Sequence, residues 1–273
     1  MNKKYLHIIF FWGILGFNGF TQKLNLLKTI KIPSVQNVSM DLYGNIYLAD
    51  NQGYLTQYNG NGDSLKRFAS EQTAHLSSLE AWKGLKILLF YRDLQRYTWL
   101  NRFLVPLETQ NLDGEKIGFA RLLTYANDGN LWLFDEQDFS LKKYQISTNT
   151  IHTKTPCDLL FSSKTYLLSF LREYQNQVFL VDADSGIFIF DNFGNYKKKL
   201  QISNINFISF VKDDIAYIHK NVLYLHHLYT DVQHKLHLPI EYNYKDFFLI
   251  SMDYLYMFTA KEMLIFKYDK KNP

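Results

Sequence analysis

The chain has 273 residues, 46 of them aromatic, and a formal charge of +4. An apolar fraction of 47% with balanced charge excludes intrinsic disorder, and the low Gly and Pro content excludes collagen-like and low-complexity chains. The single cysteine, Cys157, excludes a disulfide framework and thiolate-rich metal sites.

Residues 1–21 are predicted to be a signal peptide. Lys3 and Lys4 give a positive start, residues 5–17 form an apolar run that is short for a membrane span, and small residues precede Gln22. We therefore expect cleavage near Thr21, export to the periplasm or the cell exterior, and no membrane span after signal removal. The alternatives are an uncleaved anchor and a buried first strand. Residues 22–273 are expected to form a single domain.

Three segments share one pattern, which is a turn, a short apolar strand and a final acidic residue. They are residues 41–50, 126–135 and 173–182, and each is followed by two further strands. Weaker copies around residues 84–90, 214–219 and 254–259 fill the gaps. The copies recur about every 42 residues, which is the spacing of four-stranded propeller blades.

The repeat predicts an all-β fold, a six-bladed β-propeller. Its last copy supplies strands only at residues 247–250, 255–258 and 264–268, so one strand is missing. Residues 26–32 precede the first full copy and have no blade of their own. We expect this N-terminal strand of the mature chain to close the last blade, because each blade buries its faces only against neighbours.

The sequence Gly44-Asn-Ile-Tyr-Leu-Ala-Asp50 resembles the NHL-repeat and YWTD-like six-bladed β-propeller family, in which such a strand precedes one ending in an aromatic residue. The resemblance covers residues 35–270 and departs most in the second unit, where Phe90 replaces the aspartate. It implies the fold, whereas propellers host many activities.

Asp50, Asp135 and Asp182 occupy equivalent places in the repeat. In similar propellers this aspartate accepts backbone N–H bonds where the strand meets the turn, so we expect a structural role. Its repetition around a ring argues against an acid/base or calcium-binding cluster.

The irregular second unit holds the residues that we predict to contact a ligand or partner. Aromatic rings with guanidinium groups suit sugar stacking, anionic ligands or a protein surface, and departures from local rules concentrate at functional sites. The alternative is a divergent blade with its rings packed between sheets. The predicted contact residues are Trp82, Arg92, Arg96, Tyr97, Trp99 and Arg102.

Other motifs do not indicate catalysis. Five of the eight histidines lie within residues 219–237, but adjacent His226 and His227 point to opposite faces of a strand, so we expect no metal site. Lysines 197–199 are typical of a protected outer strand, and no nucleic acid partner is expected. The sequence contains no phosphate-binding loop, dinucleotide fingerprint or nucleophile elbow, and we predict no catalytic residue and no cofactor.

The sequence favours an exported, non-catalytic binding or scaffolding module of the cell envelope. Its partner would be an envelope protein or a small ligand. The alternative is a lactonase-type propeller hydrolase or lyase with an axial divalent metal. An enzyme should have titratable side chains that converge at the mouth of the central channel, whereas a binding module should have an apolar or plugged channel and an exposed patch.

Overall fold

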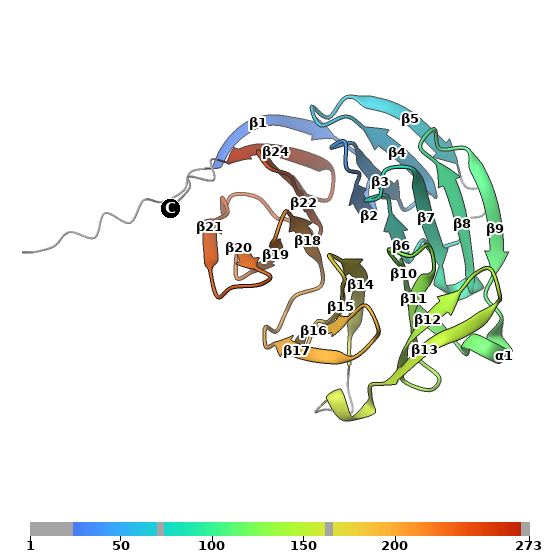
Figure 1. The fold of residues 1–273 in the computed structure, drawn as a ribbon. Helices are drawn as coiled ribbons and strands as arrows, with labels where there is room; N and C mark the ends of the chain where they lie inside the picture. The colour runs from blue at the N-terminus through green and yellow to red at the C-terminus, as the bar shows by residue number, and fades with distance from the viewer. Residues whose placement is uncertain (1–23, 70–73, 162–165, 269–273) are drawn as a thin grey trace, which may run out of the picture.

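The computed structural model describes residues 24–69, 74–161 and 166–268. These residues form six four-stranded antiparallel sheets in a ring (Figure 1), which confirms the predicted six-bladed β-propeller. The predicted signal peptide lies outside the described residues. Among the residues described, no helix combines the length and the apolar character that a membrane span requires.

Five blades are meanders of four consecutive strands, the sixth combines three consecutive strands with the N-terminal strand, and the first strand of each meander lies nearest the axis (Figure 1). The first blade comprises β2 (Val35–Met40), β3 (Ile46–Asp50), β4 (Tyr54–Tyr58) and β5 (Ser64–Ala69). The second comprises β6 (Ser78–Glu80), β7 (Lys86–Tyr91), β8 (Arg96–Asn101) and β9 (Pro106–Asn111). The third comprises β10 (Ala120–Tyr125), β11 (Leu131–Asp135), β12 (Ser140–Gln145) and β13 (Thr150–Pro156).

The remaining blades follow the same order. The fourth comprises β14 (Leu168–Tyr174), β15 (Gln177–Asp182), β16 (Gly186–Asp191) and β17 (Tyr196–Leu200). The fifth comprises β18 (Ile208–Val211), β19 (Asp214–His219), β20 (Val222–His227) and β21 (Gln233–His237). The sixth comprises β22 (Phe248–Ile250), β23 (Tyr254–Phe258), β24 (Glu262–Tyr268) and β1 (Leu24–Lys31).

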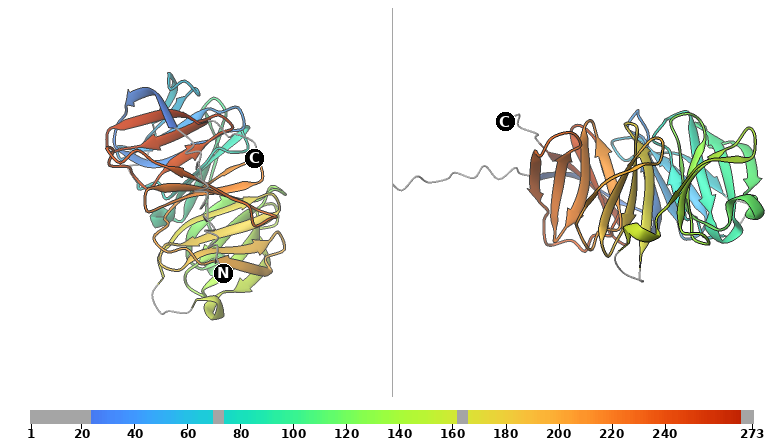
Figure 2. Two further views of the ribbon diagram at one scale, coloured as in Figure 1. Left: turned by 90° about the vertical axis from the view of Figure 1, so that its left-hand side faces the viewer. Right: turned by 60° about the horizontal axis from the view of Figure 1, so that its bottom comes forward.

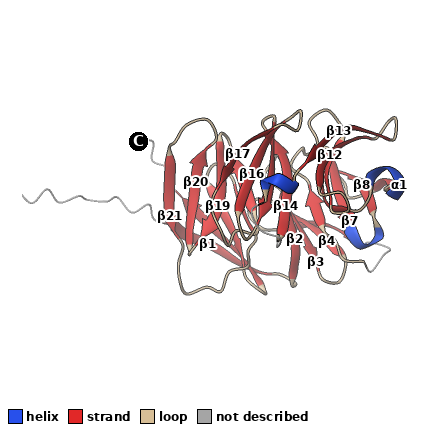
Figure 3. Ribbon diagram, turned by 90° about the horizontal axis from the view of Figure 1, so that it is seen from below, coloured by secondary structure: helices blue, strands red, loops and turns tan. Residues whose placement is uncertain are grey.

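Short helical segments occur only in connections of the described chain. They are η1 (Arg92–Leu94), α1 (Gly114–Ile117) and η2 (Asp158–Leu160), and the strands dominate every view (Figures 2 and 3). Because the four strands of a blade alternate in direction, the turn after each first strand and the turn after each third strand lie on the same face of the ring.

The N-terminal strand closes the ring, as predicted. Strand β1 pairs antiparallel with β24, with Leu24 opposite Tyr268 and Lys31 opposite Glu262. Lys28 also reaches the first blade, where its Nζ donates to the Asn61 carbonyl oxygen and to Asp63 Oδ1, both at 2.9 Å. The β1 strand therefore joins the last blade to the first.

The core lies between consecutive blades. Tyr47, Trp132 and Phe179 occupy equivalent positions in the middle of the sheets and are fully buried. Aromatic and aliphatic side chains from facing sheets form four core clusters, which together cover the interfaces around the ring. The aromatic excess of the sequence is therefore used mainly for packing between blades.

Cys157 belongs to the core cluster between the third and fourth blades. Burial raises the pKa of its thiol to about 11, so the reactive thiolate is scarce at neutral pH. We predict that Cys157 resists alkylation by iodoacetamide in the native protein and reacts fully in guanidinium chloride. Mass spectrometry of the alkylated product checks this, and rapid modification of the native protein would contradict it.

Candidate binding site at the mouth of the central channel

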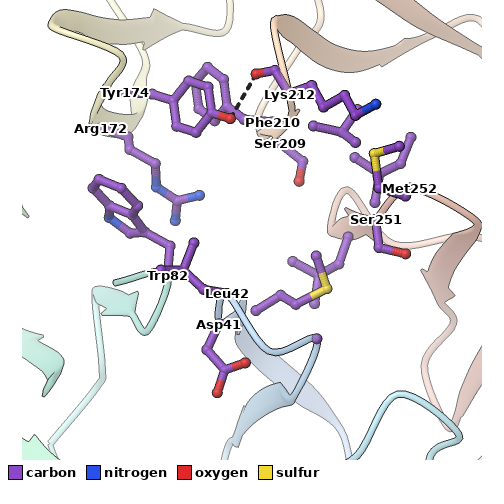
Figure 4. A pocket seen from close by; sticks show the side chains of 15 residues that line it. Asp41, Leu42, Trp82, Arg172, Tyr174, Ser209, Phe210, Lys212, Ser251 and Met252 are labelled. Carbon is purple, nitrogen blue, oxygen red and sulfur yellow. Dashed lines mark hydrogen bonds between the residues drawn. The ribbon is translucent and has the colours of Figure 1, made fainter. Parts of the chain in front are cut away.

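The inner strands end around a cavity of about 350 Å³ at one mouth of the central channel (Figure 4). It is lined by residues near the ends of β2, β14, β18 and β22, by the turns after β2, β18 and β22, and by Trp82 after β6. Most of the lining is apolar, with Met40, Val211 and Leu249 among its residues. Leu42 and Met252 expose apolar surface at its rim.

Asp41 is the carboxylate that lines this cavity, and the fold already uses it. Its oxygens accept hydrogen bonds from the backbone N–H groups of Tyr43 and Asn45, the Asn45 amide and the Tyr47 hydroxyl, all within 3.0 Å. Such a fully bonded carboxylate holds the turn between β2 and β3 and is poorly suited to act as a general base.

Arg172 and Glu80 form an ion pair across the channel. The Nε of Arg172 donates to both carboxylate oxygens at 3.2 and 3.3 Å, and its Nη2 donates to Oε1 at 3.1 Å. Both side chains are buried, with exposed fractions of 7% and 4%. Because β6 and β14 belong to the second and fourth blades, the pair connects blades that are not neighbours.

Burial raises the pKa of Glu80, although the charge of Arg172 and the hydrogen bonds that it donates oppose this shift. Trp82 and Tyr174 flank the guanidinium (Figure 4), and their ring centroids are 6.2 Å apart. The Tyr174 hydroxyl donates to the Lys212 carbonyl oxygen at 2.7 Å. Arg172 is thus held in one orientation by its salt bridge and its aromatic neighbours.

Lys83 and Glu173, which also lie near the mouth, have partners as well. The ammonium of Lys83 lies 3.9 Å from the Tyr125 ring centroid and donates to the Ala126 carbonyl oxygen. Burial lowers the pKa of Lys83, although Glu173 opposes the shift. Glu173 itself accepts a hydrogen bond of 2.7 Å from the Trp132 indole. These contacts connect the second, third and fourth blades.

The six residues predicted from the second unit do not converge. Trp82 lines the mouth cavity, whereas Tyr97 and Trp99, with exposed fractions of 1% and 4%, pack between blades. Arg96 and Arg102 lie at opposite ends of the third strand of the blade. The arginine partners within the blade are Asp93 for Arg92, Asn111 for Arg96 and the Phe103 ring for Arg102.

Replacement of Trp99 by alanine is expected to destabilise the protein by about 3–5 kcal/mol, because it removes a buried indole. Its ring contacts Tyr125 at a centroid distance of 4.7 Å. Urea unfolding followed by circular dichroism measures the effect. Replacement of Phe103, which is about half exposed, is the matched control and should change stability little. Equal effects of the two variants would contradict the packing role of Trp99.

The repeated aspartates are buried and accept backbone N–H bonds. Asp50 accepts from Gln52 and Tyr54 at 2.9 and 3.0 Å. Asp135 accepts from Phe119 and Gln137, both at 2.9 Å. Asp182 accepts from Leu167 at 2.7 Å. The carboxylates therefore satisfy backbone groups at the ends of the second strands.

In the second blade, which lacks this aspartate, the side-chain amide of Gln95 makes the corresponding hydrogen bonds to the backbone. The Gln95 side chain donates to the carbonyl oxygens of Arg92 and Ala120 at 2.7 and 2.9 Å and accepts from the Ala120 N–H at 2.8 Å. One side-chain amide thus bonds the corner of its own blade and the start of the next.

The described residues contain no group of three or more His, Cys, Asp or Glu side chains placed to hold a metal ion. In the fifth blade, His226 and His227 are consecutive residues of β20 and alternate between its faces. The cavity at the channel mouth contributes paired charges, aromatic rings and apolar surface, which suit binding of a ligand group.

Sequence reasoning missed Arg172, Glu80 and Ser209 as residues of the channel. Each lies on a first strand, where successive side chains alternate between the two faces of the sheet. That alternation was the available signal, but the strands are short and the residues that meet come from different blades.

Comparisons with known proteins show the fold and leave the family open. No family model matches the chain, and no curated protein matches it. Solved structures similar to it include BamB from Moraxella catarrhalis, with a TM-score of 0.55, 9% identity and coverage of 92% of this chain and 99% of that chain.

Two further structures show the breadth of the likeness. The WD40 domain of Neurospora crassa Pan2 has a TM-score of 0.63, 10% identity and coverage of 92% of this chain and 97% of that one. A streptogramin B lyase has a TM-score of 0.57, 12% identity and coverage of 85% and 78%. The protein is therefore a β-propeller by fold, and its own six sheets give the blade number.

Proposed function

We propose that this protein is an exported, non-catalytic binding module of the cell envelope, and that its ligand or protein partner docks at the mouth of the central channel. One observation carries the docking part of the proposal: the mouth cavity is mainly apolar, and of its charged groups Asp41 and Arg172 are hydrogen-bonded within the fold while Lys212 is exposed at the rim. Such a lining favours burial of an apolar group over proton transfer.

The rim of the cavity supports the same proposal. Leu42, Tyr43 and Leu85 are large apolar side chains that are mostly exposed, and Met252 is partly exposed. Leu42 and Tyr43 lie in the turn after the first strand of the first blade, and Leu85 and Met252 lie in the corresponding turns of the second and sixth blades. The Tyr43 ring packs over Gly84, which belongs to the same turn as Leu85. An exposed apolar surface that continues into a cavity is typical of a binding site.

The lactonase-type alternative requires acidic or amide side chains that converge on the axis. Among the described residues at this end of the channel, the Asp41 carboxylate lines the cavity and its hydrogen bonds hold its own turn, whereas the Glu80 carboxylate is paired with Arg172. The similarity to a streptogramin B lyase concerns the fold, and folds of this kind host many activities. We therefore favour the binding module.

Site-specific photo-crosslinking tests the docking face. A photoreactive residue is placed at Leu42, which is 74% exposed at the mouth, or at Leu159, which is 92% exposed in the connection between β13 and β14 on the opposite face. In cells that express the full chain, we expect a discrete crosslinked product from position 42 and none from position 159. Absence of a product from position 42, or the same product from both positions, would overturn the proposed docking face.

Export is tested separately by fractionation and N-terminal sequencing of the protein recovered from cells. We expect the mature chain to begin at Gln22 and to be found outside the cytoplasm. Recovery of an intact Met1 terminus from the cytoplasmic fraction would contradict this part of the proposal and would leave the docking face unaffected.

A further inference from the structure

The guanidinium of Arg172 has one edge that the fold leaves open. Its Nε and Nη2 donate to Glu80, which occupies one side of the planar group. Nη1 has no hydrogen-bond partner in the described part of the chain, although the side chain is only 7% exposed. A guanidinium carries five N–H donors, so Nη1 and the second N–H of Nη2 form a remaining pair of parallel donors.

The open edge faces the mouth cavity. Arg172 lines this cavity, and its guanidinium points into the space enclosed by the lining side chains (Figure 4). The salt bridge with Glu80 and the Phe170 ring, whose centroid lies 4.8 Å from the guanidinium carbon, hold the group in this orientation. A donor pair held in this manner on a mostly buried side chain is preorganised for an acceptor supplied from outside.

Ser209 is a second polar group aimed at the same space. It is 4% exposed, and its hydroxyl points into the cavity in Figure 4. Within the described residues this hydroxyl has no hydrogen-bond partner. A Ser hydroxyl donates one hydrogen bond, and thus it complements the donors of Arg172 around a single acceptor group.

Apolar surface surrounds these donors. Met40 and Leu249 line the same cavity, and Phe210, which is stacked on Tyr174 at a centroid distance of 4.4 Å, completes the wall. Lys212 adds an exposed positive charge at the rim. A volume of about 350 Å³ lies near the lower end of ligand pockets, so the cavity suits a short terminal group.

We infer that the cavity binds the C-terminal residue of a peptide, with its carboxylate on Arg172 and Ser209 and an apolar side chain against Met40 and Leu249. This inference rests on the proposed function and specifies its ligand. The planar fork of a guanidinium matches the two oxygens of a carboxylate, and the apolar walls select against a charged last side chain.

Fluorescence anisotropy with labelled peptides tests the inference on the full chain. The probes are a tripeptide that ends in leucine with a free carboxylate, the same peptide as its C-terminal amide, and a peptide that ends in aspartate. We expect the free acid ending in leucine to bind at least about tenfold more tightly than either other peptide. The amide loses the charge-assisted hydrogen bonds of the carboxylate, and the peptide that ends in aspartate would bury a charged side chain against the apolar wall. Octanoate, as a non-peptide carboxylate, should compete weakly.

Two variants separate recognition from folding. Ser209→Ala and Arg172→Lys should each weaken binding of the free acid and reduce its preference over the amide, because one removes the hydroxyl and the other removes the planar fork. Arg172→Lys keeps a cation beside Glu80. Ser147→Ala, in an exposed turn, is the control and should leave binding unchanged. Thermal melts of each variant establish that it is folded.

The outcomes distinguish this inference from the docking face itself. Equal affinity for the acid and the amide would overturn carboxylate recognition and leave the proposed docking face standing. The same conclusion would follow if no peptide bound but position 42 still gave a crosslinked product. Stronger binding of octanoate than of the leucine peptide would overturn the peptide as ligand. Loss of both peptide binding and the crosslink would overturn both proposals.

Discussion

Glu80→Ala is expected to lower the free energy of unfolding by about 3–5 kcal/mol, because it leaves the buried Arg172 without its partner. The carboxylate receives three hydrogen bonds from Arg172 of 3.1–3.3 Å, and both side chains are almost inaccessible. Urea unfolding monitored by circular dichroism measures the change. A loss below about 1 kcal/mol, as for an exposed pair, would contradict the structural importance of this ion pair.

The double variant Glu80→Met with Arg172→Met provides the control for this prediction. Replacement of both partners by apolar side chains removes the uncompensated charge, so it should recover most of the stability lost in Glu80→Ala. If the double variant is as unstable as the single one, the loss arises from packing in the channel and not from the unpaired guanidinium.

The second large effect is expected at the closure of the ring. Ile30→Asp in β1 should destabilise the protein by at least about 2 kcal/mol, because it removes apolar packing and places a charge against the core. Ile30 packs against the core cluster that includes the first and last blades. The Ile30 side chain packs so closely on the turn between β4 and β5 that a Cβ atom at Gly62 would lie only 1.8 Å from Ile30 Cδ1. Position 62 therefore requires glycine.

Leu27→Asp is the matched control, because Leu27 lies on the same strand and is more than half exposed. It should change the melting temperature little, whereas Ile30→Asp should lower it clearly. A chain that begins at Ser34 and therefore lacks β1 should lose cooperative unfolding, since the last blade is left with an open edge. Equal melting temperatures for the Leu27 and Ile30 variants would contradict closure by β1.

The architecture was largely predictable from the sequence. Asp50, Asp135 and Asp182 mark the ends of equivalent strands, and their spacing gives the blade length. The missing strand of the last copy and the unassigned N-terminal segment together predicted the closure seen in β1 and β24. These features are local and periodic, so the chain records them directly.

The candidate site was predicted only in part. The irregular second unit pointed to Trp82, which lines the mouth, but it also pointed to Tyr97 and Trp99, whose rings pack between blades. Composition identifies aromatic side chains and cannot assign them to a face, because a core ring and a ligand-binding ring have the same apolar surface.

The amino-acid sequence by itself determined the strand repeat, the blade number and the strand that closes the ring, because each follows from alternation and spacing along the chain. Only the tertiary structure placed Glu80 beside Arg172, 92 positions away, with Ser209 on the same cavity. Residues on the axis come from separate blades, so no local pattern relates them. Their meeting depends on the radius and closure of the whole ring.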